Sequence, residues 1–378
     1  MDIIRYSNLR LPMIKKILSF TPLISLILCF SVYAQEPLVW INPLDSGREN
    51  IVHGKAEASP DYFRLPETIR EEVRQPVWRL SRHAAGLKLK FTTGAKNINV
   101  RYSVSGSHAM PHMPATGVSG VDLYAKTASE QWVWVKGNYS FADTILYDFI
   151  INDEFQEVRQ YELYLPLYNE VSYLELGVPL GASIEILPKE SSKQAIVVYG
   201  TSIAQGACAS RPGMAWTAIV ERNVNLPVIN LGFSGNGQLE RPLIAYMAEI
   251  ESSLYILDCL PNLVRDTFDQ GEVKNRIRDA VKLLKSRRPH TPILLVDHAG
   301  YTDELINTER KEAYQKRNSW SRQTYQELLD AGIQGLFYLK KDAIGLGMDA
   351  TVDGTHPSDL GMDQYARAYT AKIREILP

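Results

Sequence analysis

The segment Val197-Val198-Tyr199-Gly200-Thr201-Ser202-Ile203-Ala204-Gln205-Gly206 decides the fold of the second half of this 378-residue chain. An apolar, β-branched run ends abruptly in Gly-Thr-Ser, and small residues and a helical pattern follow it. A short apolar run bounded by turn residues is typical of a buried strand. The segment therefore predicts a strand that delivers Ser202 to the mouth of an α/β domain.

The composition is that of an ordinary globular protein, with 45% hydrophobic and 22% charged residues. The length is sufficient for two domains and a sizeable core. The formal net charge is −2 and no block of basic residues occurs. There is therefore no electrostatic reason to expect nucleic acid or an anionic membrane as a partner.

The amino terminus has the pattern of a secretory signal peptide. Lys15-Lys16 precede an apolar run over residues 17–30, and Val32-Tyr33-Ala34 then offers a cleavage site. The apolar run is too short to be a comfortable membrane span. We expect residues 1–34 to be removed after Ala34, which predicts a secreted or periplasmic protein with no stable membrane insertion.

The cysteines leave two points open. Cys29 raises the question of a lipoprotein anchor, but Leu28 is large where a small residue is needed, which favours ordinary cleavage. Cys208 and Cys259 would then remain in an oxidising compartment. They form either a disulfide or two buried thiols.

Residues 36–190 carry strand signals. Segments that alternate between apolar and polar residues with period two are separated by turn residues such as Gly94, Gly106 and Gly137-Asn138, with no convincing helix between them. The predicted strands are 87–91, 97–104, 121–124, 132–135, 161–165, 173–176 and 183–186. Such spacing predicts an all-β sandwich, jelly-roll-like, as a first domain.

One loop of this region carries two histidines, His108 and His112. Pro111 and Pro114 discourage the helix that would bring residues four apart together, so a metal site is not favoured. We expect the loop to pack on the second domain and to contribute to a substrate cleft.

Around Ser191-Ser192-Lys193 the pattern changes to alternating strands and helices, which predicts a parallel sheet with crossover helices over residues 194–378. The predicted strands are 195–199, 228–231, 254–258, 293–297 and 336–338. The predicted helices are 214–223, 240–251, 272–287, 309–330 and 362–375. Ligands of such sheets bind beyond the carboxyl ends of the strands.

The residues that follow these strands form a chemical set. A serine hydroxyl needs a base, and His356 is the candidate, while Asp353 in the same turn can orient it. Ser202 and Gly235 can offer backbone N–H groups, and Asn262 a side-chain amide, to an oxyanion. Gly232 and Gly237 compete with Gly235 for this role.

These blocks, in this order, resemble the SGNH/GDSL hydrolase family. The matching segments are Gly200-Thr-Ser-Ile, Asn230-Leu-Gly-Phe-Ser-Gly-Asn, Leu260-Pro-Asn and Asp353-Gly-Thr-His356-Pro. The resemblance covers about residues 194–378. It implies a three-layer α/β/α domain with a five-stranded parallel sheet, Ser202 as nucleophile, Asp353 and His356 as the acid–base pair, and Gly235 and Asn262 as oxyanion donors.

Two positions depart from the family pattern. Thr201 stands where the family usually has aspartate, and Leu263 follows Asn262 where the family usually has a second aspartate. A β-sandwich before such a domain is similar to secreted carbohydrate esterases that deacetylate plant polysaccharides. The resemblance therefore implies a serine acetylesterase acting on an acetylated oligo- or polysaccharide through an acyl-enzyme, without metal or organic cofactor.

Other interpretations remain. Ser202 alone could be a helix N-cap. An α/β-hydrolase is disfavoured because Ala204 replaces the final glycine of its Gly-x-Ser-x-Gly elbow. The alternatives are a glycan-binding protein with a relic hydrolase domain and a lipid or thioester hydrolase of the same family. Arg211 and His298, which should lie near the strand ends, are candidate substrate contacts.

Overall fold

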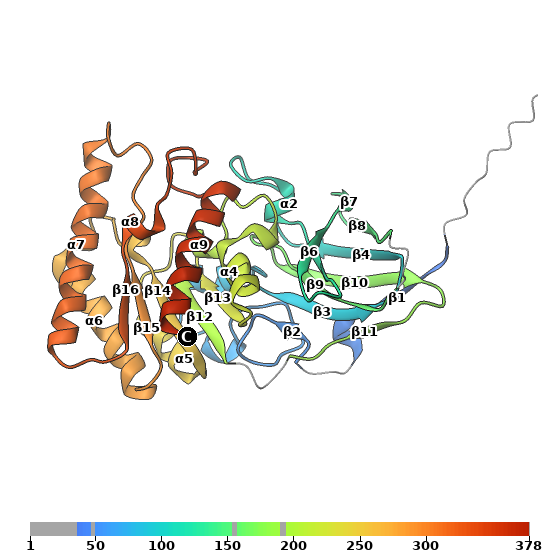
Figure 1. The fold of residues 1–378 in the computed structure, drawn as a ribbon, viewed down its shortest axis with the longest axis horizontal. Helices are drawn as coiled ribbons and strands as arrows, with labels where there is room; N and C mark the ends of the chain where they lie inside the picture. The colour runs from blue at the N-terminus through green and yellow to red at the C-terminus, as the bar shows by residue number, and fades with distance from the viewer. Residues whose placement is uncertain (1–35, 47–49, 153–156, 190–193, 378) are drawn as a thin grey trace, which may run out of the picture. The chain divides into compact units, whose positions relative to one another are not determined.

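The structure is a computed structural model, and it describes residues 36–46, 50–152, 157–189 and 194–377 (Figure 1). The predicted signal peptide and the predicted boundary around residues 191–193 lie outside the described residues. Residues 37–378 cluster as one compact unit, so the division into a domain of residues 36–190 and one of residues 194–378 stays a prediction. Within the described ranges, no helix combines the length and apolarity that crossing a membrane requires.

The second half contains the predicted parallel sheet, with strand order β13-β12-β14-β15-β16. All four neighbouring pairs are parallel. The strands are β12 (Ala195–Gly200), β13 (Val228–Gly232), β14 (Ser252–Asp258), β15 (Ile293–Val296) and β16 (Leu336–Leu339). Each predicted strand is confirmed, with ends that differ by at most two residues. Every residue of β12 is buried, as its unbroken apolar sequence requires.

Helices cover both faces of this sheet (Figure 1). They are α4 (Trp216–Val224), α5 (Arg241–Glu249), α6 (Gln270–Arg287), α7 (Thr308–Asp330) and α9 (Asp359–Ile376). Alternate side chains of β12 divide between two cores: Val197 and Tyr199 pack with α5, α6 and α7, whereas Ile196 and Val198 pack with α4 and α9. The three-layer α/β/α architecture is therefore confirmed.

Short helical turns follow three of the strands: α3 (Ser202–Gln205) after β12, η4 (Leu260–Asn262) after β14 and α8 (Lys341–Ile344) after β16. A further turn, η3 (Pro212–Met214), follows α3. These turns reverse the chain close to the sheet edge, so that their residues stay beside the strand ends.

Two antiparallel sheets make up the first half. One has the order β1-β10-β4-β8-β7, and the other β11-β3-β9-β5-β6 with β2 paired to β3. The strands are β1 (Leu38–Ile41), β2 (Val52–His53), β3 (Lys88–Thr93), β4 (Asn97–Val104), β5 (Asp122–Lys126), β6 (Trp132–Val135), β7 (Gly137–Ser140), β8 (Ile145–Ile150), β9 (Arg159–Tyr164), β10 (Val171–Pro179) and β11 (Ile184–Ile186). A single apolar core contains side chains of both sheets, which is the packing of a sandwich.

Two expectations for this half were wrong. Gly137-Asn138 is not a turn but the start of β7, because the chain passes at Lys136 from β6 in one sheet to β7 in the other. Helical segments also interrupt the strands: α1 (Gln75–Ser81), α2 (Ala115–Val118), η1 (Pro43–Ser46) and η2 (Glu67–Ile69). Helix α1 escaped prediction because it is short and its buried Val77 packs in the core of α5, α6 and α7 instead of the sandwich.

Two charged side chains connect the first half with the parallel sheet. Arg64, with 1% exposure, donates from Nη1 to the carbonyl oxygens of Asn230 (3.2 Å) and Gly232 (2.6 Å) on β13. Asp122 on β5 accepts from Arg211 Nη1 (2.5 Å) and the Gly213 N–H (2.9 Å). Because a buried charge needs a partner, both contacts fix the sandwich region against the α/β layers.

Asp258, the last residue of β14, generates a prediction about stability. Burial raises its pKa from the usual 3.8 to about 6, although the Tyr369 hydroxyl donates to its Oδ2 (2.9 Å). The folded state therefore binds this proton more tightly than the unfolded state. The protonated Asp258 carboxyl therefore stabilises the folded state. This contribution to the free energy of unfolding is complete below about pH 4 and is lost as the pH rises through 6.

We expect Asp258→Asn to raise the free energy of unfolding at about pH 8 by up to about 3 kcal/mol, because the cost of burying the charge disappears. At about pH 5 the gain should shrink by roughly half. Urea denaturation of both proteins at the two pH values measures this. Asp279→Asn, on the exposed face of α6, is the control and should show no such pH dependence. An equal effect of Asp258→Asn at both pH values would contradict the prediction.

Candidate active site

Ser202 lies where β12 turns into α3. The Thr201 side chain caps this helix by accepting from the Ile203 N–H (3.3 Å), and Gly206 ends it in the left-handed conformation (φ 109°). As the first residue of the helix, Ser202 has a backbone N–H without a partner inside the helix. The N-cap is therefore Thr201 and not Ser202, so the Ser202 hydroxyl is free for another role.

The Ser202 hydroxyl hydrogen-bonds to His356, which lies in the loop between α8 and α9. The distance from Ser202 Oγ to His356 Nε2 is 2.9 Å. The other ring nitrogen, Nδ1, lies 2.7 Å from Asp353 Oδ2. Two segments that are distant in the sequence, the start of α3 and the turn that carries Asp353 and His356, thus form one hydrogen-bonded chain from carboxylate to hydroxyl.

The Asp353 carboxylate is held by its own turn. Its Oδ1 accepts from the backbone N–H groups of Thr355 (3.0 Å) and His356 (2.8 Å). Partial burial alone would raise the pKa of Asp353, but the hydrogen bonds from His356 and Thr355 outweigh it and hold the pKa below the usual value. Asp353 is therefore ionised at neutral pH and orients the imidazole.

The backbone of the loop after β13 distinguishes three competing glycines. The Gly232 N–H donates to Asn230 Oδ1 (2.8 Å), and the Gly237 N–H donates to Asn262 Oδ1 (3.0 Å). The Gly235 N–H has no partner among the described residues, and Gly235 has a positive φ of 68°. Of the three, Gly235 is therefore the one whose N–H is available to a ligand.

The same contact orients Asn262, at the end of η4. Because its Oδ1 is occupied by the Gly237 N–H, its Nδ2 group is turned the other way, and no described residue accepts from it. The structure thus brings an unpaired amide and an unpaired backbone N–H to the sheet edge that carries Ser202.

Two buried amides that the sequence interpretation did not assign hold these loops in place. Gln205 accepts from the Ser234 N–H (3.0 Å) and donates to the Leu167 carbonyl (3.0 Å). Asn230 donates to the Ala204 carbonyl (2.7 Å) in addition to its contact with Gly232. A polar side chain inside an otherwise apolar strand or helix start is the signal that could have identified them.

The loop that carries His112 packs on the second half, as predicted. Thr116 Oγ1 donates to the Ser210 carbonyl (2.7 Å). The His112 ring lies 5.9 Å from the His356 ring, measured between centroids. His108 instead lies 5.8 Å from Phe141, so only one of the two histidines reaches the site.

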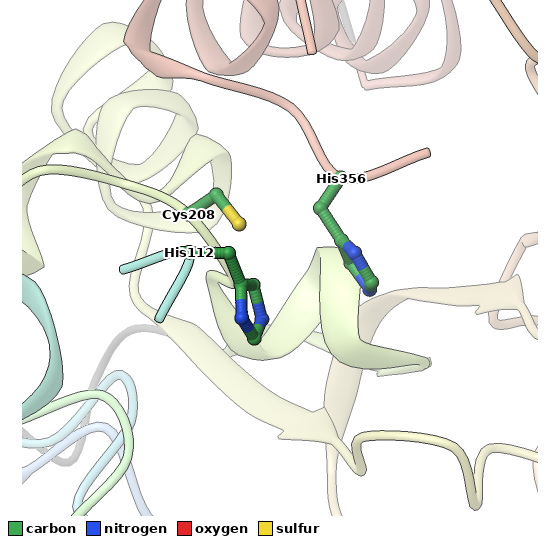
Figure 2. A group of neighbouring side chains, drawn as sticks. All are labelled: His112, Cys208 and His356. Carbon is green, nitrogen blue, oxygen red and sulfur yellow. The ribbon is translucent and has the colours of Figure 1, made fainter. Parts of the chain in front are cut away.

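Cys208 and Cys259 are both free thiols and both are buried, so they form no disulfide in the described structure. Cys208 lies beside His112 and His356 (Figure 2). Burial raises the pKa of its thiol to about 12, with the nearby Asp353 charge adding to the effect. Cys208 is therefore a neutral thiol and not an alternative nucleophile.

The two candidate substrate contacts, His298 and Arg211, lie in different surroundings. His298 is buried at 2% exposure, its Nδ1 accepts from the Gly300 N–H (2.9 Å), and it packs between Tyr301 and Tyr314. It therefore offers nothing to a ligand at the surface. Arg211 is engaged with Asp122 and Tyr124 (2.7 Å) and lies over Trp134, so its contacts connect the two halves of the chain.

Asp122 is the residue of this junction that the sequence interpretation missed. Its carboxylate accepts from Trp134 Nε1 (2.5 Å) as well as from Arg211 and Gly213. An acidic residue inside the apolar segment Val121-Asp-Leu-Tyr124 was the available signal.

A separate cavity of about 520 Å³ lies at the opposite, amino-terminal ends of β12 and β13, and its lining includes Lys55, Glu162, Ala195 and Pro227. Its lining contains none of Ser202, Asp353 or His356. We therefore place the functional site at the carboxyl ends of the strands on chemical grounds, not on the size of the hollow.

Two family models match the chain. The GDSL-like lipase/acylhydrolase family matches residues 193–374, and the N-terminus of SGNH-hydrolase-type esterases matches residues 38–184. No curated protein matches the sequence closely enough to count as a relative.

Solved structures resemble the whole described chain. A protein from Bacteroides ovatus described as a GDSL-like lipase is 32% identical, with a TM-score of 0.82, over 90% of this chain and 98% of that one. The salicylyl-acyltransferase SsfX3 of a tetracycline biosynthetic pathway is 20% identical, with a TM-score of 0.69, over 90% and 97%. A family two carbohydrate esterase from Cellvibrio japonicus is 14% identical, with a TM-score of 0.55, over 91% and 99%. At 20% and 14% sequence identity, the last two similarities show a shared fold and nothing about activity.

Gly237 gives a test of how tightly the site is built. A Cβ at this position would lie 2.1 Å from the Gly200 carbonyl oxygen, which cannot move without displacing β12. We expect Gly237→Ala to lower the free energy of unfolding by about 1–3 kcal/mol. Gly347→Ala is the matched control, because its Cβ would meet only the amide end of Gln364 at 3.2 Å. Denaturant unfolding of both variants measures the difference, and equal stability would contradict the expectation.

Proposed function

The chain belongs to the GDSL-like lipase/acylhydrolase family of ester hydrolases, and on that premise we propose that it removes short acyl groups, chiefly acetyl, from a carbohydrate. The observation that carries the proposal is the hydrogen-bonded chain Ser202–His356–Asp353, with contacts of 2.9 and 2.7 Å. Such a chain is the arrangement that turns a weak serine hydroxyl into a nucleophile.

In the first step, Ser202 Oγ attacks the ester carbonyl carbon while His356 Nε2 takes the hydroxyl proton. Asp353 remains ionised and stabilises the imidazolium that forms. His356 then returns the proton to the leaving sugar oxygen, and the acyl group stays on Ser202. Water, deprotonated by His356, attacks the acyl-enzyme and releases the acid and free Ser202.

The negative oxygen that develops on the carbonyl needs donors aimed at it. The Ser202 N–H, the Gly235 N–H and Asn262 Nδ2 are the three donors that we assign, because each lacks a partner among the described residues. They are fixed before the substrate arrives, so the reaction does not have to reorient them.

The carbohydrate part of the proposal rests on the fold and on the exposure of the site. The fold is shared with a family two carbohydrate esterase, and His112 and Asp353 are exposed beside Ser202. An open, polar site suits a large hydrophilic substrate such as an acetylated plant polysaccharide. The pattern of residues 1–34 supports secretion, which fits such a substrate because these polymers lie outside the cell.

Two alternatives are distinguished by activity. A relic hydrolase domain that only binds glycans has no need for the intact Ser202–His356–Asp353 chain. A lipid or thioester hydrolase would use the same chemistry on another acyl group. Acetate release from acetylated xylan, mannan and pectin, compared with hydrolysis of a long-chain ester, separates these classes.

Ser202→Ala tests the nucleophile. The wild-type protein should release a burst of nitrophenol from p-nitrophenyl acetate, and the variant should lose turnover by a factor on the order of 10⁴ to 10⁶. Ser319→Ala, on the exposed surface of α7, should retain it. Unchanged turnover in Ser202→Ala would exclude the proposed mechanism.

Asn262→Ala tests the oxyanion site. Loss of one donor should lower kcat by about 10²–10³-fold with little change in KM. Asn262→Asp keeps an oxygen for the Gly237 N–H but loses the amide donor, so it should be equally impaired if donation matters. Near-normal kcat in the aspartate variant, with a defect in the alanine variant, would show that Asn262 only positions the loop.

A further inference from the structure

The proposed catalytic histidine belongs to a cluster of three side chains that can each bind a metal ion. His112, Cys208 and His356 each offer one ligand atom, and these atoms all lie within 4.8 Å of one another. Figure 2 shows the three side chains arriving from separate segments of the chain. The proposed hydrolysis uses only His356, so the other two side chains have no assigned role there.

The segments that carry His112 and Cys208 are held in place by backbone contacts. Met110 and Met113 exchange two backbone hydrogen bonds of 3.0 Å, so His112 lies in the tight turn between them. Cys208 has a positive φ of 68°, which is uncommon for a residue with a side chain. It follows directly on the turn in which the Ala207 N–H donates to the Ser202 carbonyl (2.9 Å). The thiol is thus kept close to His356.

The donor set suits a particular class of metal. Two imidazoles and a thiolate are ligands of Zn²⁺ and related borderline ions, whereas Mg²⁺ and Ca²⁺ prefer oxygen. Bonds of about 2.0–2.3 Å place the ligand atoms of a tetrahedral site roughly 3.5 Å apart. Because the present separations are at most 4.8 Å, the ligand atoms have to approach by no more than about 1.3 Å, and rotation of the exposed His112 side chain can contribute to this.

An outer carboxylate is also in place. Asp353 accepts from His356 Nδ1 at 2.7 Å, which leaves the lone pair on Nε2, where it faces Ser202 Oγ at 2.9 Å and where a metal ion would replace the hydroxyl. This is the carboxylate–histidine arrangement that orients zinc ligands in proteins.

We propose that Zn²⁺ binds to His112, Cys208 and His356, with water in the fourth position, and that binding switches the esterase off. The Cys208 thiol gives its proton to solvent as the sulfur–zinc bond forms, because metal coordination deprotonates a thiol. The Nε2 lone pair of His356 then belongs to the metal and cannot take the Ser202 proton. The ion is an inhibitor, not a cofactor of the reaction. The inhibitory effect rests on the proposed function, whereas the metal site does not.

Binding is measured without reference to activity. The full-length protein, freed of metal by a chelator, is titrated with Co²⁺ in the absorption spectrometer and with Zn²⁺ in the calorimeter. We expect one ion per chain and the near-ultraviolet absorption of a thiolate–cobalt bond. Mg²⁺ should give no binding.

Matched variants identify the ligands. Cys208→Ala and His112→Ala should each weaken Zn²⁺ binding by more than about 10–100-fold, the range seen when only an outer partner of a ligand is lost. The controls are Cys259→Ala, which alters the other buried thiol, and His108→Ala, which alters the other histidine of the same loop. Both should bind Zn²⁺ with wild-type affinity. Unchanged Zn²⁺ affinity in both ligand variants, or absence of the thiolate–cobalt band, would overturn the site. Because His112 lies on an exposed turn, its variant keeps the test valid if Cys208→Ala does not fold.

Inhibition is measured separately on p-nitrophenyl acetate. Zn²⁺ should abolish wild-type turnover reversibly with chelator, and Cys208→Ala should keep its metal-free rate while losing most of its sensitivity to Zn²⁺. Zn²⁺ binding without any hydrolysis in the metal-free protein would refute the proposed function and leave the metal site standing. Hydrolysis that Zn²⁺ does not affect would refute the inhibition alone.

Discussion

The arrangement of the molecule depends on the shared direction of the five strands. Because all neighbouring pairs are parallel, the segments after β12, β13 and β14 emerge at the same edge of the sheet. Strand β12 lies between β13 and β14, so Ser202 has the Gly235 loop on one side and Asn262 on the other. Ser202, Gly235 and Asn262 therefore stay close to buried strands, whereas His356 reaches the site from the loop beyond β16 and α8.

Hydrogen bonds from uncharged amide side chains hold the loops at this edge of the sheet in place. The Gln205 and Asn262 amide oxygens accept from the loop after β13, and the Asn230 amide nitrogen donates to the Ala204 carbonyl of α3. Amides suit this position because burying an unpaired charge costs far more free energy than burying a satisfied amide. The ionised group, Asp353, is instead left partly exposed in a turn that supplies two N–H donors.

The parallel sheet and the order of the blocks could be predicted because strands such as Ala195–Gly200 are apolar throughout and helices such as Gln270–Arg287 have a clear period. The structure brings Ser202, His356 and Asp353 together, and the last two would be close in any fold because they share one turn. The junction could not be predicted in this way. Arg211 lies near the strand ends, but its contacts depend on Asp122, which is distant in sequence. His298 follows a strand as expected, yet aromatic neighbours enclose it. Helix α1 depends on a core to which it contributes from the other half of the chain.

Arg64 has a consequence for how the protein behaves in a crowded solution. Strand β13 is the outermost strand of the parallel sheet, and an outermost strand normally leaves carbonyl groups open to pairing with another chain. The Arg64 guanidinium occupies the carbonyls of Asn230 and Gly232, so a foreign strand would have to displace a buried cation to add there. We therefore expect the segment between β2 and η2, which carries Arg64, to protect the neighbouring sheet against aggregation. It does so with one side chain, and without lengthening the sheet itself.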